Sequence, residues 1–384
     1  MSIDRELPPV GDEPPPPGGE VAPAVANPTL AERLDAGTAE GALWRLEGRG
    51  VRCVACGHRC LIGENRRGIC RVRFNRGGRL QVPFGYVNGL QNDPIEKKPF
   101  YHVQPGAFAL TFGMLGCDLH CAYCQNWVTS QALRDSAAAG AMRRITPEAV
   151  VECARRAGAR LVVSSYNEPL ITAEWAAAIF RLARPAGLGC ALVSNGHATP
   201  EVLEYLGPLL TAIKIDLKGF DARRYRSLGG NLGRVLETIR AVHARRLWLE
   251  IVTLVVPGFN DDEAELRALA RFIASVSPDI PWHVTAFHPD YQMRETAPTG
   301  TAQLLRAAEI GAGEGLRFVY AGNRPGRVGR WEHTWCPHCH QLVVERAGWT
   351  IRRNRIDAEG RCGHCRAPLP GVWAGAADPE LPCP

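Results

Sequence analysis

The sequence predicts an α/β protein whose parallel sheet forms a partial (βα)6-type TIM barrel. From Phe108 onwards, short apolar runs alternate with amphipathic stretches, which is typical of repeated strand–helix units. Six or seven such units fit the pattern, too few for the complete eight-unit barrel. The predicted strands span residues 107–113, 160–165, 189–194, 211–217, 247–255, 282–287 and 316–320.

Helix starts are marked by capping signals between these strands. Thr146-Pro147-Glu148, Thr199-Pro200-Glu201 and Asp261-Asp262-Glu263 each offer a cap, a helix-compatible proline or a first-turn acid. Upstream, Leu30 to Ala36 fits a short helix that Gly37 ends.

Composition divides the chain into five parts. Residues 1–28 are rich in proline, glycine and acid, bury too little apolar surface to offset ordering entropy, and are predicted to be a disordered tail. A module with four cysteines follows at 29–100, the barrel at 101–330, a second cysteine module at 331–375 and a short tail at 376–384.

Charge and hydropathy exclude several classes of protein. The net charge of +6 is too mild to indicate nucleic-acid binding, and Arg352, Arg353 and Arg355 form a small patch that is more often a solvated face. No apolar run reaches the roughly 18 residues of a membrane span, and the N-terminus lacks an apolar signal region. Fourteen cysteines in such a chain favour metal ligation in the cytoplasm over disulfides.

The most informative motif is Cys-x3-Cys-x2-Cys, formed by Cys117, Cys121 and Cys124 directly after the first predicted strand. Three thiolates can hold three irons of a four-iron cluster, so the fourth iron stays open for another ligand. An open position is typical of a working metal site. The alternatives are a zinc site with one distant ligand, or three unrelated thiols.

With Tyr123 before the last cysteine, this segment resembles the radical S-adenosylmethionine (SAM) superfamily. Four further segments resemble one of its subgroups, the AmmeMemoRadiSam system radical SAM enzymes, which are related to the pyruvate formate-lyase activating enzymes. The resemblance covers residues 40 to 375, and those segments are Asp93-Pro94-Ile95-Glu96-Lys97-Lys98-Pro99, Tyr166-Asn167-Glu168-Pro169, Val256-Pro257-Gly258-Phe259-Asn260-Asp261 and Pro370-Gly371-Val372-Trp373.

The resemblance implies a chemistry. The open iron binds the amino and carboxylate groups of SAM, and one electron cleaves the sulfonium to methionine and a 5′-deoxyadenosyl radical. That radical abstracts hydrogen from a substrate at the barrel mouth. An electron donor such as flavodoxin or ferredoxin is expected as a partner.

Polar residues that end the predicted strands are the candidate cofactor contacts. From the residues alone they are turn-formers, caps or, for Asp216 with a lysine, a structural ion pair. The resemblance assigns them to SAM, with Tyr166 and Asn167 in place of two glycines of the superfamily's Gly-Gly-Glu-Pro stretch. The resulting set is Tyr123, Asn167, Glu168, Ser194, Asn195, Asp216, Lys218 and His288.

Two further cysteine groups flank the barrel. Cys336-x2-Cys339 and Cys362-x2-Cys365 predict a four-thiolate zinc ribbon, with rubredoxin-like iron as the alternative metal. Cys53, Cys56, Cys60 and Cys70 also offer four thiolates. Soft thiolates suit both zinc and an auxiliary iron–sulfur cluster, so the spacing leaves both open.

The sequence leaves three hypotheses for the target. The first is a glycyl-radical activase acting on another protein. The second is modification of a small molecule or protein residue in a pathway with the Memo-type and AmmeCR-type proteins that name the subgroup. The third is a cysteine-rich metal-binding scaffold without catalysis, which the intact three-cysteine motif disfavours.

Overall fold

A computed structural model describes residues 28–138 and 140–373. The two predicted tails therefore lie outside the described residues, apart from residue 28. Its centre is an eight-stranded sheet in the order β16-β15-β14-β13-β12-β11-β9-β8. All neighbouring strands run parallel except β8, which pairs antiparallel with β9. The strands are β8 (Gly89–Pro94), β9 (Phe108–Gly113), β11 (Leu161–Ser164), β12 (Gly189–Ser194), β13 (Ala212–Asp216), β14 (Trp248–Val255), β15 (Trp282–Ala286) and β16 (Val319–Gly322).

Helices connect the parallel strands, as expected for parallel neighbours that need a crossover. Within the described part of the chain, each of β9 and β11 to β15 is followed by a helix, which gives six strand–helix units and a closing strand. The helices are α2 (Trp127–Ser130), α3 (Pro147–Arg156), α4 (Ala173–Ala183), α5 (Pro200–Leu206), α6 (Ala222–Ser227), α7 (Leu232–Ala244), α8 (Glu263–Val276) and α9 (Thr301–Gly313).

The predicted helix caps form. Thr146, Thr199 and Asp262 each accept backbone N–H groups in the first turn of α3, α5 and α8. The strands between them are largely buried on both faces, as parallel strands covered by helices are. The α/β prediction is therefore confirmed, whereas closure of the sheet into a partial TIM barrel stays a prediction.

One predicted strand begins later than expected. The pattern placed it at 316–320, but β16 begins at Val319. The reason is that the Leu316 N–H bonds back to Gly311 and ends α9, while the Arg317 N–H bonds to Pro278. Neither N–H group bonds to a strand of the central sheet, so the strand begins only after these two residues.

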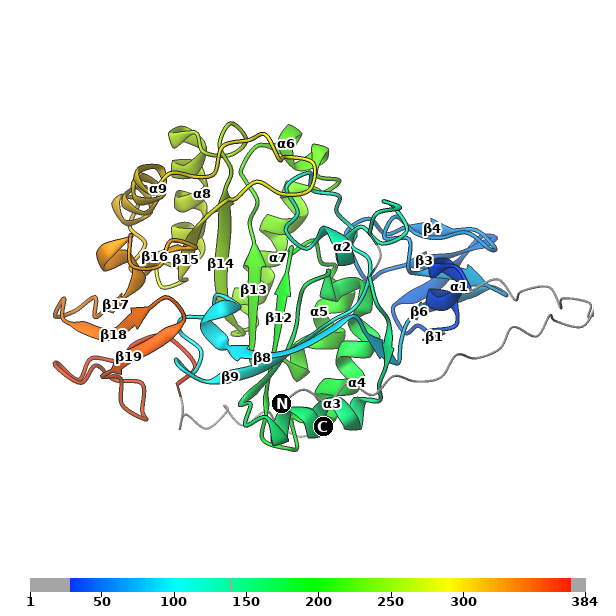
Figure 1. Ribbon diagram of the computed structural model, residues 1–384, viewed down its shortest axis with the longest axis horizontal. Helices are drawn as coiled ribbons and strands as arrows, with labels where there is room; N and C mark the ends of the chain where they lie inside the picture. Colours follow the sequence, from blue (N-terminus) through cyan, green and yellow to red (C-terminus); the bar gives the residue numbers. More distant parts are fainter. Residues whose placement is uncertain (1–27, 139, 374–384) are drawn as a thin grey trace, which may run out of the picture.

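The N-terminal and C-terminal segments lie at opposite ends of the long axis, with the central sheet between them (Figure 1). The blue N-terminal segment contains the predicted short helix and small antiparallel sheets. Its elements, with one later strand that pairs with it, are α1 (Leu30–Asp35), β1 (Thr38–Glu40), β2 (Trp44–Glu47), β3 (Gly50–Cys53), β4 (Leu61–Ile62), β5 (Phe74–Arg76), β6 (Arg79–Pro83), β7 (Tyr86–Val87) and β10 (Arg143–Arg144).

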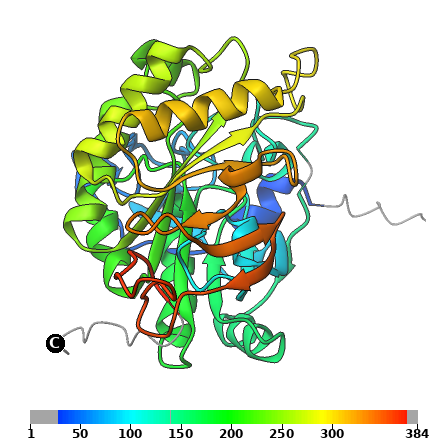
Figure 2. The same ribbon diagram turned by 90° about the vertical axis from the view of Figure 1, so that its left-hand side faces the viewer.

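The C-terminal segment forms a three-stranded antiparallel sheet from β17 (Thr334–Trp335), β18 (Leu342–Ala347) and β19 (Thr350–Asn354). Figure 2 looks onto the end of the molecule where these orange strands lie. Arg346 joins this sheet to the centre, because its guanidinium donates to the Tyr101 carbonyl at 2.9 Å. In the described residues, no helix is long and apolar enough to cross a membrane.

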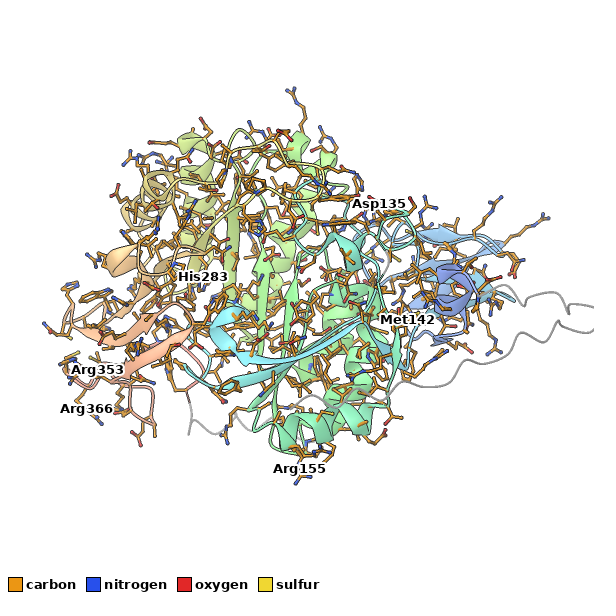
Figure 3. The ribbon with its side chains drawn as sticks, viewed as in Figure 1. Asp135, Met142, Arg155, His283, Arg353 and Arg366 are labelled. Atoms are coloured by element: carbon orange, nitrogen blue, oxygen red, sulfur yellow. The ribbon has the colours of Figure 1, made fainter. Side chains whose placement is uncertain are left out.

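Side chains divide between this interior and the periphery (Figure 3). His283 on β15 is buried, and its Nε2 lies 2.6 Å from Glu250 on the neighbouring strand β14. Arg155, Arg353 and Arg366 project outward and are exposed. These three arginines therefore lie on the surface of the protein.

Candidate active site

Two adjoining cavities lie where the parallel strands end. The larger has a volume of about 440 Å³ and the smaller about 100 Å³. Both are lined by Cys121, Cys124, Asp216 and Lys218, so they form one continuous site. This is the edge of an α/β sheet at which ligands usually bind.

The loop after β9 carries the three cysteines to the smaller cavity. Helix α2 holds both ends of this loop. The Gly116 N–H donates to the Thr129 carbonyl, and the Ser130 hydroxyl lies 3.2 Å from Cys124 Sγ. Gly116 has a φ of 93°, and a Cβ there would come within 2.8 Å of Val72. Only glycine fits this turn, which is the entry to the cysteine loop.

Burial favours the protonated form of two of these thiols, those of Cys117 and Cys121. It raises the pKa of Cys117 well above its ordinary value and that of Cys121 to about 12. Such thiols ionise only when a cation takes the place of the proton. Three thiols around one small cavity therefore fit a metal cluster better than they fit free cysteines.

Glu168 follows β11 and is held by three donors. The Ser194 hydroxyl donates at 2.7 Å, the Asn195 N–H at 2.8 Å and the Leu170 N–H at 3.0 Å. Burial raises the pKa of Glu168 to about 8, and the Asp118 charge adds to the effect. Ser194 and Asn195 thus contribute to the site by holding the Glu168 carboxylate in place.

Tyr166 takes the backbone conformation that glycine would favour. Its φ is 71°, in the left-handed region that non-glycine residues rarely adopt. Next to it, the Asn167 side-chain oxygen accepts the Met114 N–H at 2.9 Å. Tyr166 therefore holds a turn that glycine would adopt without strain, while Asn167 ties this turn to the residue that follows β9.

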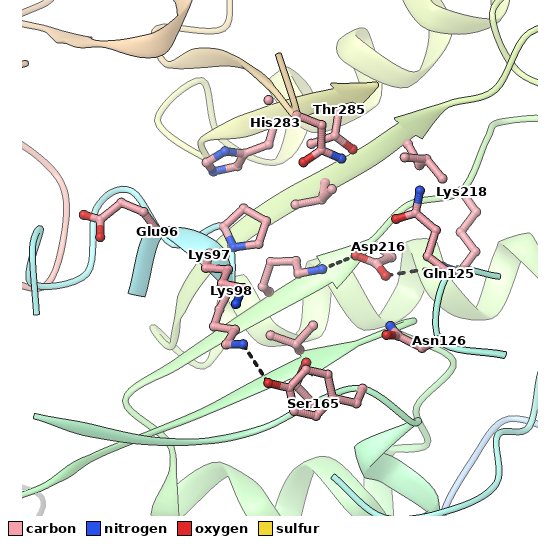
Figure 4. Close-up of a pocket in the computed structure, with 18 of the residues that line it drawn as sticks. Glu96, Lys97, Lys98, Gln125, Asn126, Ser165, Asp216, Lys218, His283 and Thr285 are labelled. Carbon is pink, nitrogen blue, oxygen red and sulfur yellow. Dashed lines mark hydrogen bonds and ion pairs between the residues drawn. The ribbon is translucent and has the colours of Figure 1, made fainter. Parts of the chain in front are cut away.

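Asp216 at the end of β13 lies between two lysines (Figure 4). It pairs with Lys214 and, at 3.3 Å, with Lys218. Burial would raise the pKa of Asp216, but the two lysines hold it below its ordinary range. Lys214, Asp216 and Lys218 thus form a row of ion pairs along the larger cavity.

The opposite wall was not singled out from the sequence as a site. Lys98 is buried, with its ammonium 3.1 Å from Asp93 Oδ2 and 3.0 Å from the Tyr166 hydroxyl. Glu96 and Lys97 lie beside it in Figure 4. The only sequence signal was the motif that spans Asp93 to Pro99, to which no side-chain role had been given.

Of the predicted cofactor contacts, Tyr123 lies in the site and His288 does not. Tyr123 lines the larger cavity and packs edge-on against Phe259, with ring centroids 5.4 Å apart. His288, in contrast, is exposed and lines neither cavity, with its Nδ1 3.4 Å from the Pro289 carbonyl oxygen. All the other predicted cofactor contacts line one of the two cavities. They therefore lie in one site, from which His288 is absent.

Comparison with known proteins identifies the family of the region that carries this site. The model of the Radical SAM superfamily matches residues 112–270, which include the three cysteines, Glu168 and Asp216. The uncharacterized protein MJ0808 of Methanocaldococcus jannaschii is 35% identical over 84% of this chain and 95% of its own length. The chain belongs to the radical SAM superfamily.

More distant relatives have named activities. The isethionate sulfite-lyase activating enzyme of Oleidesulfovibrio alaskensis is 29% identical over 39% of this chain and 50% of its own length. The pyruvate formate-lyase 1-activating enzyme of Escherichia coli K12 is 26% identical over 44% of this chain and 69% of its own. A radical SAM methyltransferase structure from Sphaerobacter thermophilus aligns with a TM-score of 0.45 at 17% identity, over 62% of this chain and 71% of that one.

Membership of the radical SAM superfamily implies an enzyme with a [4Fe–4S] cluster and SAM. The donor set of this radical SAM chain fits that implication, since three buried or half-buried thiols line a cavity that continues into a larger one. A catalytic enzyme is thus supported over the scaffold hypothesis.

The C-terminal cysteines of this radical SAM chain could hold a metal ion. The sulfurs of Cys336 and Cys365 are 3.7 Å apart, and those of Cys339 and Cys362 are 3.8 Å apart. All four lie within 4.8 Å of one another. Tetrahedral zinc with Zn–S bonds of about 2.3 Å requires sulfurs about 3.8 Å apart.

The N-terminal cysteines also approach one another. Cys53, Cys56 and Cys70 are buried, whereas Cys60 is half-buried and accepts the Ile69 N–H at 3.4 Å. Burial raises the pKa of Cys70 to about 11, and the neighbouring Cys53 adds to it. In the described residues, however, these four do not close to the spacing of the C-terminal group.

Proposed function

We propose that this protein reductively cleaves SAM and uses the resulting radical to abstract hydrogen from a substrate. The observation that carries the proposal is the continuous cavity that joins Cys117, Cys121 and Cys124 to Glu168 and, across from it, to the ion-pair row at Asp216. A bound [4Fe–4S] cluster would supply the electron that breaks the sulfonium bond. The protein contributes to the reaction by positioning SAM and the substrate.

Each side chain has a distinct task in this proposal. Glu168 offers a carboxylate to the SAM ammonium, and Ser194 and Asn195 keep that carboxylate in place by donating to it. Asp216 and Lys218 are set at the strand end for the ribose and the SAM carboxylate. Tyr123, buried beside the last cysteine, packs where the adenine would lie.

The larger cavity leaves room for a substrate beyond SAM. Its far wall consists of Glu96, Lys97, Lys98 and Trp349, and the Lys97 ammonium lies 5.5 Å from the centre of the Trp349 ring. Trp349 lies between β18 and β19, so the C-terminal sheet contributes to this wall. We place substrate recognition there.

We assign the chain to the AmmeMemoRadiSam subgroup of radical SAM enzymes, on the segments that resemble it. Among substrates, a glycyl-radical enzyme is favoured by the activating enzymes among the relatives. An electron donor such as flavodoxin or ferredoxin would complete the system. A reducing compartment such as the cytoplasm suits an oxygen-labile cluster.

Around this centre we propose a partial TIM barrel over residues 101–330, with metal-binding modules at 29–100 and 331–375. Zinc at Cys336, Cys339, Cys362 and Cys365 is supported by the sulfur spacing. The group at Cys53, Cys56, Cys60 and Cys70 would hold a second metal or cluster.

The experiment that tests the proposal examines the open iron directly. The anaerobically reconstituted, iron-57-labelled protein is studied by Mössbauer spectroscopy before and after addition of SAM. We expect the signal of one iron of the four to change, because only that iron lacks a thiolate. Equal response of all irons, or none, would overturn the proposal. The Glu96→Gln variant keeps all the cysteines and serves as the control. Its spectrum should respond to SAM as that of the parent does.

A further inference from the structure

Lysine is rare in this chain, and its lysines all lie in one place. Only four of the 45 lysines and arginines are lysine, and these are Lys97, Lys98, Lys214 and Lys218. All four line the larger cavity, whereas none of the described arginines does. A lysine is a compact ammonium with three donors, and an arginine is a planar fork. The distribution indicates that this cavity requires ammonium groups, and it becomes informative only once the fold gathers two distant segments.

The four lysines form two pairs, each around one aspartate. The pair around Asp216 is the row of ion pairs assigned above to SAM. In the other pair, the Lys97 ammonium lies 2.9 Å from Asp93 Oδ1 and the Lys98 ammonium 3.1 Å from Asp93 Oδ2. Burial would raise the pKa of Asp93, but the two lysines hold it below its ordinary range. Two ammonium groups against one carboxylate therefore leave an excess positive charge at Asp93, to which no ligand has been assigned.

Lys98 has one donor left for a ligand. Its side chain is 4% exposed, and its ammonium donates to Asp93 and, at 3.0 Å, to the Tyr166 hydroxyl. These contacts use two of its three N–H groups, and no other described residue accepts the third. Burial lowers the pKa of Lys98, and Asp93 opposes that shift. A second anion beside the ammonium would therefore stabilise its charged form.

The Tyr166 hydroxyl offers a second donor at the same place. Its oxygen accepts from Lys98, so its own proton points elsewhere, and no described residue accepts that proton. Burial raises the pKa of Tyr166 to about 12, and the Asp93 charge adds to the effect, so the phenol keeps its proton at neutral pH. Tyr166 lines both cavities. The two donors therefore lie where the space beside the cysteine loop opens into the larger cavity.

We propose that the substrate carries an oxyanion, a carboxylate or a phosphate, which the Lys98 ammonium and the Tyr166 hydroxyl bind. Two adjacent donors, one of them cationic, match the acceptor oxygens of such a group. The acid of this wall, Glu96, accepts the Gly106 N–H at 2.8 Å, and burial raises its pKa to about 7, which limits its repulsion of an anion. This inference rests on the proposed function, because it names the substrate class for the same cavity.

Three small probes test the oxyanion site in full-length, cluster-loaded protein without a reductant. Methyl phosphate and acetate carry the two candidate oxyanions, and acetamide is the neutral counterpart of acetate. Saturation-transfer NMR follows the methyl signal of each probe and gives its affinity. We expect methyl phosphate, acetate or both to bind and acetamide not to bind, and the tighter binder identifies the oxyanion. Equal binding of all three probes, or binding of none, would overturn the proposal.

Variants locate the bound probe. Lys98→Met should weaken it by about tenfold or more, because an ion-paired donor is lost. Tyr166→Phe removes only one oxygen, should fold like the parent, and should weaken the probe by about threefold or more. Arg155→Met removes an exposed positive charge outside the cavity, so it is the matched control and should leave the affinity unchanged. Unchanged affinity in folded Lys98→Met or in Tyr166→Phe, or an equal loss in Arg155→Met, would contradict the site.

Addition of SAM separates this inference from the proposed function. Because the SAM carboxylate is assigned to Lys218, saturating SAM should leave the oxyanion affinity unchanged. Displacement of the probe by SAM would place the oxyanion in the SAM site and overturn the inference, while SAM binding would stand. Probe binding that requires Lys98, in a protein whose iron does not respond to SAM, would support the oxyanion site and refute the proposed SAM cleavage.

Discussion

At the scale of single residues, the site depends on how each charge is held. Glu168 accepts three hydrogen bonds, so its position is fixed before any ligand arrives. Asp216 is fixed by two lysines instead. This preorganisation suits an enzyme that must keep a reactive radical close to one substrate atom.

Replacing Glu168 with glutamine tests its proposed contact with SAM. A hydrogen bond to a charged group is worth about 1.5–3 kcal/mol, so Glu168→Gln should weaken SAM binding by about tenfold or more. The affinity is measured anaerobically by titration calorimetry on cluster-loaded protein. Glu96→Gln, another buried carboxyl group of the same cavity, should bind SAM like the parent. Equal affinities in all three proteins would remove Glu168 from the ammonium contact.

The residues predicted from the sequence were those whose signal is local. The three cysteines stand within one short segment, and Glu168, Asn195 and Asp216 lie at the end of an apolar strand or a few residues beyond it. Lys98 and Trp349 carry no such signal, because distant parts of the chain bring them to the site. Lys98 and Tyr166, for example, are 68 positions apart.

At the scale of elements, β17 to β19 depend on few apolar contacts of their own. A small cluster around Val343, Val344 and Trp373 includes or contacts three of the C-terminal cysteines, which are Cys336, Cys339 and Cys362. Such a small core seldom stabilises a fold without a metal or a disulfide. We therefore expect the C-terminal sheet to depend on the zinc proposed for these cysteines.

Cys362→Ala should release this metal and loosen the sheet. Structural zinc contributes about 10–16 kcal/mol in small zinc folds, so its loss should expose residues 334–373 to protease while the central sheet stays resistant. Zinc content and limited proteolysis are the measurements. A Cys153→Ala variant, which removes a half-buried cysteine elsewhere, should behave like the parent. Zinc kept by Cys362→Ala would contradict the assignment.

At the scale of the whole molecule, a buried ion pair fastens the N-terminal segment to the centre. Arg73 donates to both oxygens of Glu174 on α4 at 2.8 Å, and the two side chains are 1% and 5% exposed. The backbone N–H groups of Ala42 and Leu43 donate to the same carboxylate. One side chain thus joins three points of the N-terminal segment.

Removing Glu174 should therefore be costly. Glu174→Ala leaves the buried Arg73 unpaired, which typically costs about 3–5 kcal/mol in the free energy of unfolding. The comparison is Glu201→Ala, which breaks a half-exposed pair with Arg59 between the same two parts of the chain and should cost at most about 1 kcal/mol. Denaturant unfolding measures both, and equal costs would refute the anchoring role.

The same pair predicts a dependence of stability on pH. Burial alone would raise the pKa of Glu174, but Arg73 holds it below the ordinary value of 4.5. A lowered folded pKa means that the stabilisation is complete above pH 4.5 and disappears as the pH falls through that folded value. The stability difference between the parent and Glu174→Gln should therefore shrink in acid. A difference that stays constant from pH 7 to acid would contradict this account.

The central sheet could be predicted because its pattern repeats locally, with apolar strands and capped helices in turn. The placement of the two end segments could not, because it depends on contacts such as Arg73 with Glu174 and Arg346 with Tyr101. The first two residues are 101 positions apart and the second two 245. The sequence around one partner gives no indication of where the other lies.

The most direct test of the account is anaerobic production of 5′-deoxyadenosine. Reconstituted protein is mixed with dithionite and SAM, and the product is quantified beside a Cys117→Ala variant. The account predicts 5′-deoxyadenosine from the parent and none above background from the variant, because the cavity then lacks a complete cluster. Equal production by both proteins, or a parent that holds no iron–sulfur cluster at all, would contradict it.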